Sequence, residues 1–329
     1  MVICLHYNYV GCGGLWGAVT PGTTNYYIAH FTEGFSIIAC NLFAMISGYY
    51  LSASNKIKIR KVMDIILLLV FYGVAIYIFS IRIGLISFSY DSMKLMISTI
   101  NSRWFVDIYL LLYLIHPFLN KLLNNISKKQ LLFLIAVNVF CFYLWPSITK
   151  PKDILIRTIF ISDNGYGILN FITLYFISYF IRTYQKINFL RIRYLLMLYI
   201  VIGLFVGYQL TVDLSFIAYN HILNLLNTVI VFEIFLQIKN GKWITSLSSA
   251  SLATYIIHEN WIIRQWFFRD LFKEKLFWTS KWMSVHLVIT LIGVFLLSFC
   301  IEKIRELIFD LSVKRLIDKV PLLNSIYEI

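Results

Sequence analysis

The stretch NLFAMISGYYLSASNKIKIRK, residues 41–61, decides the fold of this chain. It opens with an apolar run and ends in four basic residues, Lys56, Lys58, Arg60 and Lys61. An apolar run that ends in a basic cluster is typical of a membrane-spanning helix whose end lies at the cytoplasmic face. The stretch therefore predicts a helix that is surrounded by lipid rather than by the core of a soluble domain.

The composition extends this prediction to the whole chain. Of the 329 residues, 60% are hydrophobic, 17% are aromatic and only 14% are charged, and the mean hydropathy is +0.77. Apolar runs near the roughly 20 residues that a helix needs to cross a bilayer recur from end to end. Because backbone groups in lipid must bond within their own segment, these runs should be helices. We predict an all-α, polytopic integral membrane protein.

Charge and breaks at Gly, Pro and Asn divide the chain into about ten candidate spans. They are residues 1–12, 35–53, 62–81, 104–119, 131–146, 165–181, 194–210, 219–238, 250–268 and 283–301. The loops on one side hold more Lys and Arg than the loops on the other, which predicts that both termini are cytoplasmic. The two longest loops on the opposite side are 13–34 and 82–103. The chain then divides into a membrane domain, 1–301, and a basic cytoplasmic tail, 302–329.

The first span is short for its task. After Met1 it holds about ten apolar residues, and at a rise of about 1.5 Å per residue they cover about half of a 30 Å hydrocarbon core. Such a helix is either re-entrant or continues upstream of Met1, and we expect a missing start.

Several function classes are disfavoured by the sequence. The net charge of +13 is spread over short loops, which argues against a nucleic-acid partner. The five cysteines show no paired or metal-ligand spacing, so we expect core residues and no metal site. Phosphate-binding glycine loops and nucleophile elbows are also missing from the sequence. A site, if present, should lie within the membrane.

Ionisable residues within spans mark the candidate site, because each costs roughly 2.5 to 3.5 kcal/mol or more to bury in lipid. His258 and Glu259 are adjacent in ATYIIHENWIIRQWFF, and at about 100° per residue they cannot both face lipid. They either clamp neighbouring helices or form a site. His6 could be a general base near neutral pH or a satisfied hydrogen-bond donor. Asp107 lies in the fourth span.

Four ordered motifs now resemble a known family. They are ICLHYN, NLFAMISGYYLS with its basic loop, WFVDIYLLLYLIHPFLN and ATYIIHENWIIR. Together they resemble acyltransferase family 3, integral membrane proteins of about ten helices, and most of all the members that O-acetylate bacterial capsular or other surface polysaccharides. The resemblance implies a multi-pass protein of the bacterial cell membrane with no bound cofactor. It also implies cytoplasmic acetyl-CoA as the acyl donor and a carbohydrate hydroxyl as the acceptor.

The resemblance also assigns a catalytic residue. His6 matches the essential histidine of the first helix in this family, and we expect it to take the proton of the attacking hydroxyl. Glu259 or Asp107 would orient it, and His258 is a further catalytic candidate. The family usually has an arginine about ten residues before this histidine, and the chain starts too late to contain one.

The expected donor site lies at the end of the second span. Arg60 matches the family's basic position after its Ser-Gly-aromatic motif, so Arg60 and Lys58 would hold the phosphates of CoA. Ser47, Gly48 and Tyr49 lie at this end of the span, and the small residues among them would let the pantetheine thioester approach the helix closely. Without the resemblance, Ser47 and Gly48 form a packing notch, and the basic residues follow the usual charge bias of cytoplasmic loops.

A lipid-linked sugar flippase or a polysaccharide polymerase is the alternative from another class. A carrier of this kind would be expected to show paired half-repeats or matching broken helices, and the sequence shows neither. A polymerase would be expected to have a large charged loop outside the membrane. The longest candidates, 13–34 and 82–103, are about 20 residues each.

Overall fold

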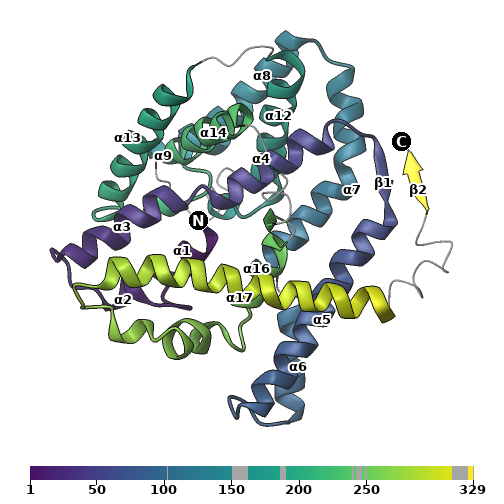
Figure 1. The fold of residues 1–329 in the computed structure, drawn as a ribbon. Coiled ribbons are helices and arrows are strands. Elements are labelled where there is room, and N and C mark those ends of the chain that lie inside the picture. Colours follow the sequence, from purple (N-terminus) through teal and green to yellow (C-terminus); the bar gives the residue numbers. More distant parts are fainter. Residues whose placement is uncertain are drawn as a thin grey trace.

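The structure, a computed structural model, describes residues 1–101, 103–149, 162–185, 190–238, 241, 247–248, 250–312 and 325–328. In these ranges the chain is almost entirely helical (Figure 1). The α-helices are α1 (Val2–Asn8), α2 (Leu15–Ala18), α3 (Thr24–Ser36), α4 (Ala39–Leu51), α5 (Ile59–Arg82), α6 (Tyr90–Asn101), α7 (Trp104–Asn124), α8 (Lys128–Val139), α9 (Trp145–Thr149), α11 (Ser162–Gly165), α12 (Ile168–Tyr184), α13 (Ile192–Leu210), α14 (Ile222–Gln237), α16 (Ser251–His258) and α17 (Met283–Ser312). The others are the π-helices η1 (Phe140–Leu144) and η3 (Trp266–Leu271), the 3-10 helices η2 (Leu214–Ile217) and η4 (Glu274–Leu276), and the strands β1 (Lys56–Lys58) and β2 (Ile326–Glu328).

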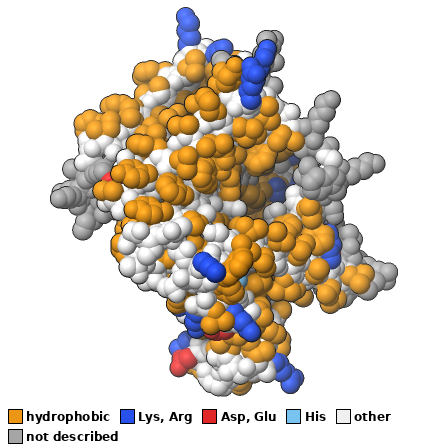
Figure 2. All heavy atoms as spheres, turned by 60° about the vertical axis from the view of Figure 1, so that its left-hand side comes forward, with side chains coloured by type: hydrophobic (Ala, Val, Ile, Leu, Met, Phe, Trp, Pro, Cys, Tyr) orange, Lys and Arg blue, Asp and Glu red, His pale blue; other side chains and the backbone are white. Residues whose placement is uncertain are grey.

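The multi-pass prediction is confirmed. Within the described residues, seven helical stretches are long and apolar enough to cross a membrane. They are Thr24–Leu51, Ile59–Arg82, Trp104–Asn124, Lys128–Thr149, Ile192–Leu210, Leu214–Gln237 and Met283–Phe309. Hydrophobic side chains cover much of the face drawn in Figure 2, as lipid contact requires. The other predicted spans hold the shorter helices α1, α12 and α16, so the count of ten stays a prediction.

Three of the predicted boundaries were wrong. The segment 13–34 is not a plain loop, because α3 begins at Thr24, where the Thr23 hydroxyl caps the helix by accepting from the backbone of Tyr26. The segment 82–103 contains α6. The predicted span 250–268 is broken, since α16 ends at His258 and the chain turns before η3.

Close helix crossings explain several glycines. A Cβ at Gly34 of α3 would lie 2.5 Å from the backbone nitrogen of Gly207 in α13. A Cβ at Gly48 of α4 would lie 3.0 Å from the Cα of Tyr175 in α12. Small residues let membrane helices approach this closely. Gly48 therefore forms the packing notch that its sequence context also allowed.

The end of the chain returns to the basic loop. Helix α17 runs without a break past residue 301, across the boundary predicted for a separate tail. Strand β2 then pairs antiparallel with β1, placing Glu328 opposite Lys56 (Figure 1). Residues 326–328 therefore lie beside the loop that precedes α5.

Helix α1 lies in the interior of the molecule (Figure 1). It packs against α3, α16 and α17. Tyr7 belongs to one of the two hydrophobic clusters, and Leu5 belongs to the other. A helix this short is therefore held by protein on several sides, and it places His6 near the centre of the bundle.

Candidate functional site

His6 and Glu259 meet in the structure, although they are far apart in the sequence. Nε2 of His6 lies 3.2 Å from Oε2 of Glu259. The two side chains are 17% and 15% exposed. His6 lies in the last turn of α1, and Glu259 is the C-cap residue directly after α16. The structure thus brings together the predicted base and one of the two carboxylates predicted to orient it.

A buried arginine fixes the end of α16. Arg103, 2% exposed, donates from Nη1 to the carbonyl of Glu259 at 2.9 Å and from Nη2 to the carbonyl of Ile256 at 3.4 Å. The last carbonyls of a helix lack partners within the helix, and a cation at this end is favourable. Asn260 then makes a tight turn, because its side-chain oxygen accepts from the backbone of Ile262. Together these contacts set the backbone position of Glu259.

The Glu259 carboxylate has three side-chain partners. Besides His6, Oε1 lies 3.1 Å from Nη1 of Arg264, and Oε2 accepts from the thiol of Cys12 at 3.5 Å. A buried carboxylate that pairs with a guanidinium and accepts further hydrogen bonds can remain ionised. An ionised Glu259 can stabilise a positive charge on His6.

The position of Glu259 also indicates the tautomer of His6. A ring nitrogen that faces a carboxylate at 3.2 Å should carry the proton, since its lone pair would repel the oxygen. The neutral His6 ring then has its lone pair on Nδ1. This atom is buried and has no hydrogen-bond partner within the described part of the chain. Nδ1 is therefore the atom of His6 that can accept a proton.

His258 lies beside His6, with ring centroids 4.9 Å apart. Its Nδ1 donates to the carbonyl of Thr254, which leaves the lone pair on Nε2. Asp107 is placed differently. It lies in the first turn of α7, and its side chain is exposed. The structure thus groups His6, His258 and Glu259 and leaves Asp107 at the surface.

A basic cavity of about 410 Å³ opens near the start of α5. Its charged lining residues are Arg60, Lys61, Asp64 and Arg305. Oxygen Oδ1 of Asp64 pairs with Arg60 at 3.0 Å, and Glu302 holds Arg305 through two bonds of 2.7 and 2.8 Å. Carboxylates thus hold the two guanidinium groups, while the Lys61 ammonium lies over the rings of Tyr109 and Tyr113. With three cations and two carboxylates, the group carries a net positive charge.

A second cavity, of about 260 Å³, adjoins the first. The two share three lining residues, Phe43, Phe105 and Leu252. The smaller cavity also touches the first residues of α1 and of α16, and it is lined by Tyr255 and His258. The two cavities together reach from the basic residues of α5 to the histidine pair.

The predicted donor-site residues separate in the structure. Arg60 lines the basic cavity, and so does Lys61, its neighbour in the same basic cluster. Tyr49 instead contacts Arg182, whose Nη1 donates to the Tyr49 carbonyl at 2.9 Å. Ser47 is half-buried on α4, and Lys58 has an exposed side chain in β1. The Lys58 backbone N–H donates to the Tyr113 hydroxyl at 2.9 Å.

A long loop covers the end of α1. Arg269 donates to the carbonyls of Gly13, at 2.7 Å, and Val10. Glu274 is fully buried against Gly13 and accepts from the indole of Trp278 at 3.3 Å. Burial raises the pKa of Glu274 to about 8, although the Trp278 hydrogen bond and the charge of Arg269 oppose the shift. The loop therefore clamps the segment that follows His6.

Comparison with known protein families shows which family the chain belongs to. The family model of acyltransferase family 3, described as an acyltransferase domain, matches residues 1–303. The chain belongs to acyltransferase family 3. The family predicted from the four motifs is thereby confirmed, and the acyltransferase family 3 match covers His6, Glu259, Arg60 and Lys61. No curated protein and no solved structure matches the chain.

Sequence reasoning missed four residues of this candidate site. Arg103, Arg264 and Arg305 had been counted only as charges of loops or of the tail, and Cys12 only as a core residue. One signal was available: Arg264 lies five residues after Glu259, within the same motif. Arg103 and Arg305 depend on long-range contacts, with α16 and α5, which the sequence alone does not show.

Proposed function

We propose that this protein is a membrane O-acetyltransferase that moves an acetyl group from cytoplasmic acetyl-CoA to a hydroxyl of a bacterial surface or capsular polysaccharide, or of its lipid-linked precursor. One observation carries the proposal. The basic cavity joins, through shared residues, a second cavity that ends at His258, with the His6–Glu259 pair next to it. An anionic cofactor with a long thin arm fits this shape.

The chemistry of CoA matches the two cavities. Its phosphates are anionic, and Arg60, Lys61 and Arg305 offer guanidinium and ammonium groups that bind phosphate oxygens. Its pantetheine arm is narrow, and the shared section is lined by Phe43, Phe105 and Leu252. The thioester would then lie near His258. This arrangement brings the acyl carbon to the histidine pair while the phosphates stay at the basic end.

The transfer follows from the tautomer of His6. Nδ1 of His6 takes the proton of the acceptor hydroxyl as its oxygen attacks the carbonyl carbon of the thioester. Glu259 stabilises the imidazolium that forms. Collapse of the tetrahedral intermediate breaks the carbon–sulfur bond, and the proton on His6 passes to the departing thiolate. The products are an O-acetyl ester and CoA with a free thiol, and His6 returns to its neutral form.

The Lys61→Ala variant tests the donor site. We expect its dissociation constant for acetyl-CoA to rise about tenfold, since the loss of one charge-assisted contact to phosphate corresponds to about 1.4 kcal/mol. The effect should shrink as salt is added, because the lost interaction is ionic. Equilibrium binding of acetyl-CoA to the purified protein in lipid nanodiscs measures it.

Lys121→Ala is the matched control for this measurement. Lys121 is an exposed lysine in the last turn of α7, and it is not among the lining residues of either cavity. The control should bind acetyl-CoA like the unaltered protein. If Lys61→Ala and Lys121→Ala bind acetyl-CoA with equal affinity, the donor does not bind in the basic cavity.

A proton NMR spectrum of surface polysaccharide tests the function itself. Cells with and without the gene are compared for the O-acetyl methyl signal and for its loss under mild alkali. The proposal requires the signal to depend on the gene. If the signal is unchanged while polymer export or chain length changes, the flippase or polymerase alternative replaces it.

A further inference from the structure

The two segments that carry His6 and Glu259 have the same order of features along the sequence. The first residues of α1 and of α16 line the smaller cavity of about 260 Å³, called the inner cavity from here on. Each segment then reaches its member of the pair, His6 or Glu259, and an aromatic residue follows shortly after it. Tyr9 follows α1 by one residue, and Trp261 follows Glu259 by two. The pair therefore lies between the inner cavity and two aromatic rings.

Both rings are exposed, and both lie next to the guanidinium of the same arginine. Tyr9 is 52% exposed and Trp261 is 49% exposed. The Cζ atom of Arg264 lies 5.9 Å from the centroid of the Tyr9 ring and 5.3 Å from the centroid of the Trp261 ring. The same guanidinium lies 3.1 Å from Oε1 of Glu259. Arg264 thus connects the exposed rings directly to the carboxylate beside His6.

Exposed aromatic residues near the ends of membrane helices often only anchor the protein at the bilayer surface. An anchor does not need a link to the interior, and it does not need to lie next to a reactive pair. Tyr9 and Trp261 have both features. Their arrangement instead puts two apolar ring faces beside one fixed guanidinium, and a precisely placed polar group of this kind fixes the orientation of a bound small molecule.

We propose that Tyr9, Trp261 and Arg264 form the acceptor subsite, in which a sugar ring of the polysaccharide stacks on the aromatic faces. The C–H face of a sugar ring is apolar and flat enough to pack on Trp and Tyr, and its hydroxyls can accept from the guanidinium. This inference rests on the proposed function, and it names the binding site of the acceptor. Donor and acceptor then approach the His6–Glu259 pair from different sides.

The test compares Trp261→Ala, Tyr9→Ala and the double variant, each as the full chain in cells that lack their own copy of the gene. The first readout is the O-acetyl content of surface polysaccharide. The second is the dissociation constant for acetyl-CoA, measured on each purified variant in nanodiscs. We expect O-acetyl content to fall at least about tenfold in the double variant, while the acetyl-CoA dissociation constant stays within about twofold. Trp261→Phe keeps an aromatic face and should restore much of the acetylation.

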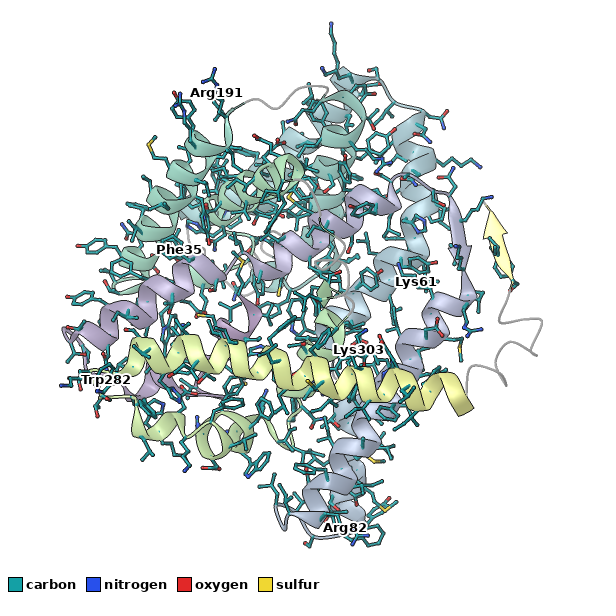
Figure 3. The ribbon with its side chains drawn as sticks, viewed as in Figure 1. Phe35, Lys61, Arg82, Arg191, Trp282 and Lys303 are labelled. Atoms are coloured by element: carbon teal, nitrogen blue, oxygen red, sulfur yellow. The ribbon has the colours of Figure 1, made fainter. Side chains whose placement is uncertain are left out.

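Trp282→Ala is the matched control. Trp282 is 58% exposed and lies just before α17, at the opposite end of the molecule from Lys61 (Figure 3). Its loss removes an interfacial anchor without touching Arg264. If the double variant acetylates as well as Trp282→Ala, the subsite is refuted. A loss of acetyl-CoA binding in all three variants also refutes it, since it indicates a structural role. If the unaltered protein does not acetylate polysaccharide, the proposed function fails, and the subsite fails with it.

Discussion

The His6→Ala variant is expected to lose O-acetyl transfer by a factor of about 10³, with an unchanged amount of protein in the membrane. A positioned general base contributes about 10²- to 10⁴-fold to a rate. Among the described histidines, His6 alone combines an ion-pair contact to Glu259 with a buried ring nitrogen that has no partner; His258 and His116 have such a nitrogen without the Glu259 contact. The measurement is the O-acetyl content of polysaccharide, together with release of free CoA thiol from acetyl-CoA in membranes.

His30→Gln provides the control for this variant. His30 is another buried histidine, on α3, whose Nδ1 is bonded to the carbonyl of Tyr26. It lies outside the site, so its replacement should leave the rate within about threefold. Undiminished acetylation by His6→Ala at a normal membrane level would refute the assignment of the base.

Replacement of Glu259 by glutamine should lower the transfer rate by about 10²-fold. The amide keeps the size of the side chain, but it removes the negative charge that stabilises the His6 imidazolium in the proposed transfer. A loss of this size is typical when one electrostatic partner of a transition state is removed. It also leaves Arg264 without its carboxylate, so some loss of stability should accompany the loss of rate. Initial rates at saturating acetyl-CoA and the thermal unfolding midpoint separate the two effects.

Asp270→Asn makes the same change of charge at a site away from His6. Asp270 pairs with Lys275 at 2.8 Å in the loop that covers the end of α1, where both side chains are half exposed. An exposed ion pair contributes little, so this variant should retain its rate and its unfolding midpoint. A Glu259→Gln protein as fast as Asp270→Asn would show that the carboxylate has no catalytic role.

The fold was predictable where the apolar runs were long. α5, α7 and α13 each lie within a few residues of a predicted span, and α17 begins at the predicted residue 283 but continues to Ser312, because burial in lipid leaves the backbone no alternative to a helix. α3 was missed because its first half, with Thr24, Asn25 and His30, is polar, and its position depends on packing against Gly203 and Gly207 of α13. Pattern alone does not show such a tertiary contact.

The site was predictable only in part, for an electrostatic reason. His6, His258 and Glu259 could be chosen because an ionisable group in an apolar run needs a partner. Arginines near helix ends gave no such signal, because charge bias explains them equally well. Arg103 and Arg264 were therefore interpreted only as part of the charge bias of the loops. In the structure Arg103 caps α16 and Arg264 pairs with Glu259. Conversely, Gly48 had a plausible donor role and is a helix contact.

The position of His6 and Glu259 between the inner cavity and the exposed rings has an electrical consequence. In the proposed transfer an acetyl cation equivalent passes from the CoA sulfur to the acceptor oxygen, and one proton passes the other way, from the acceptor hydroxyl to the sulfur, so the two charges cancel. No net charge crosses the bilayer. One elementary charge moved through 100 mV would be worth about 2.3 kcal/mol, or roughly a fiftyfold change in rate. The enzyme should therefore work equally well in energised and de-energised membranes, and an imposed diffusion potential that alters the rate in sealed vesicles would argue against this exchange.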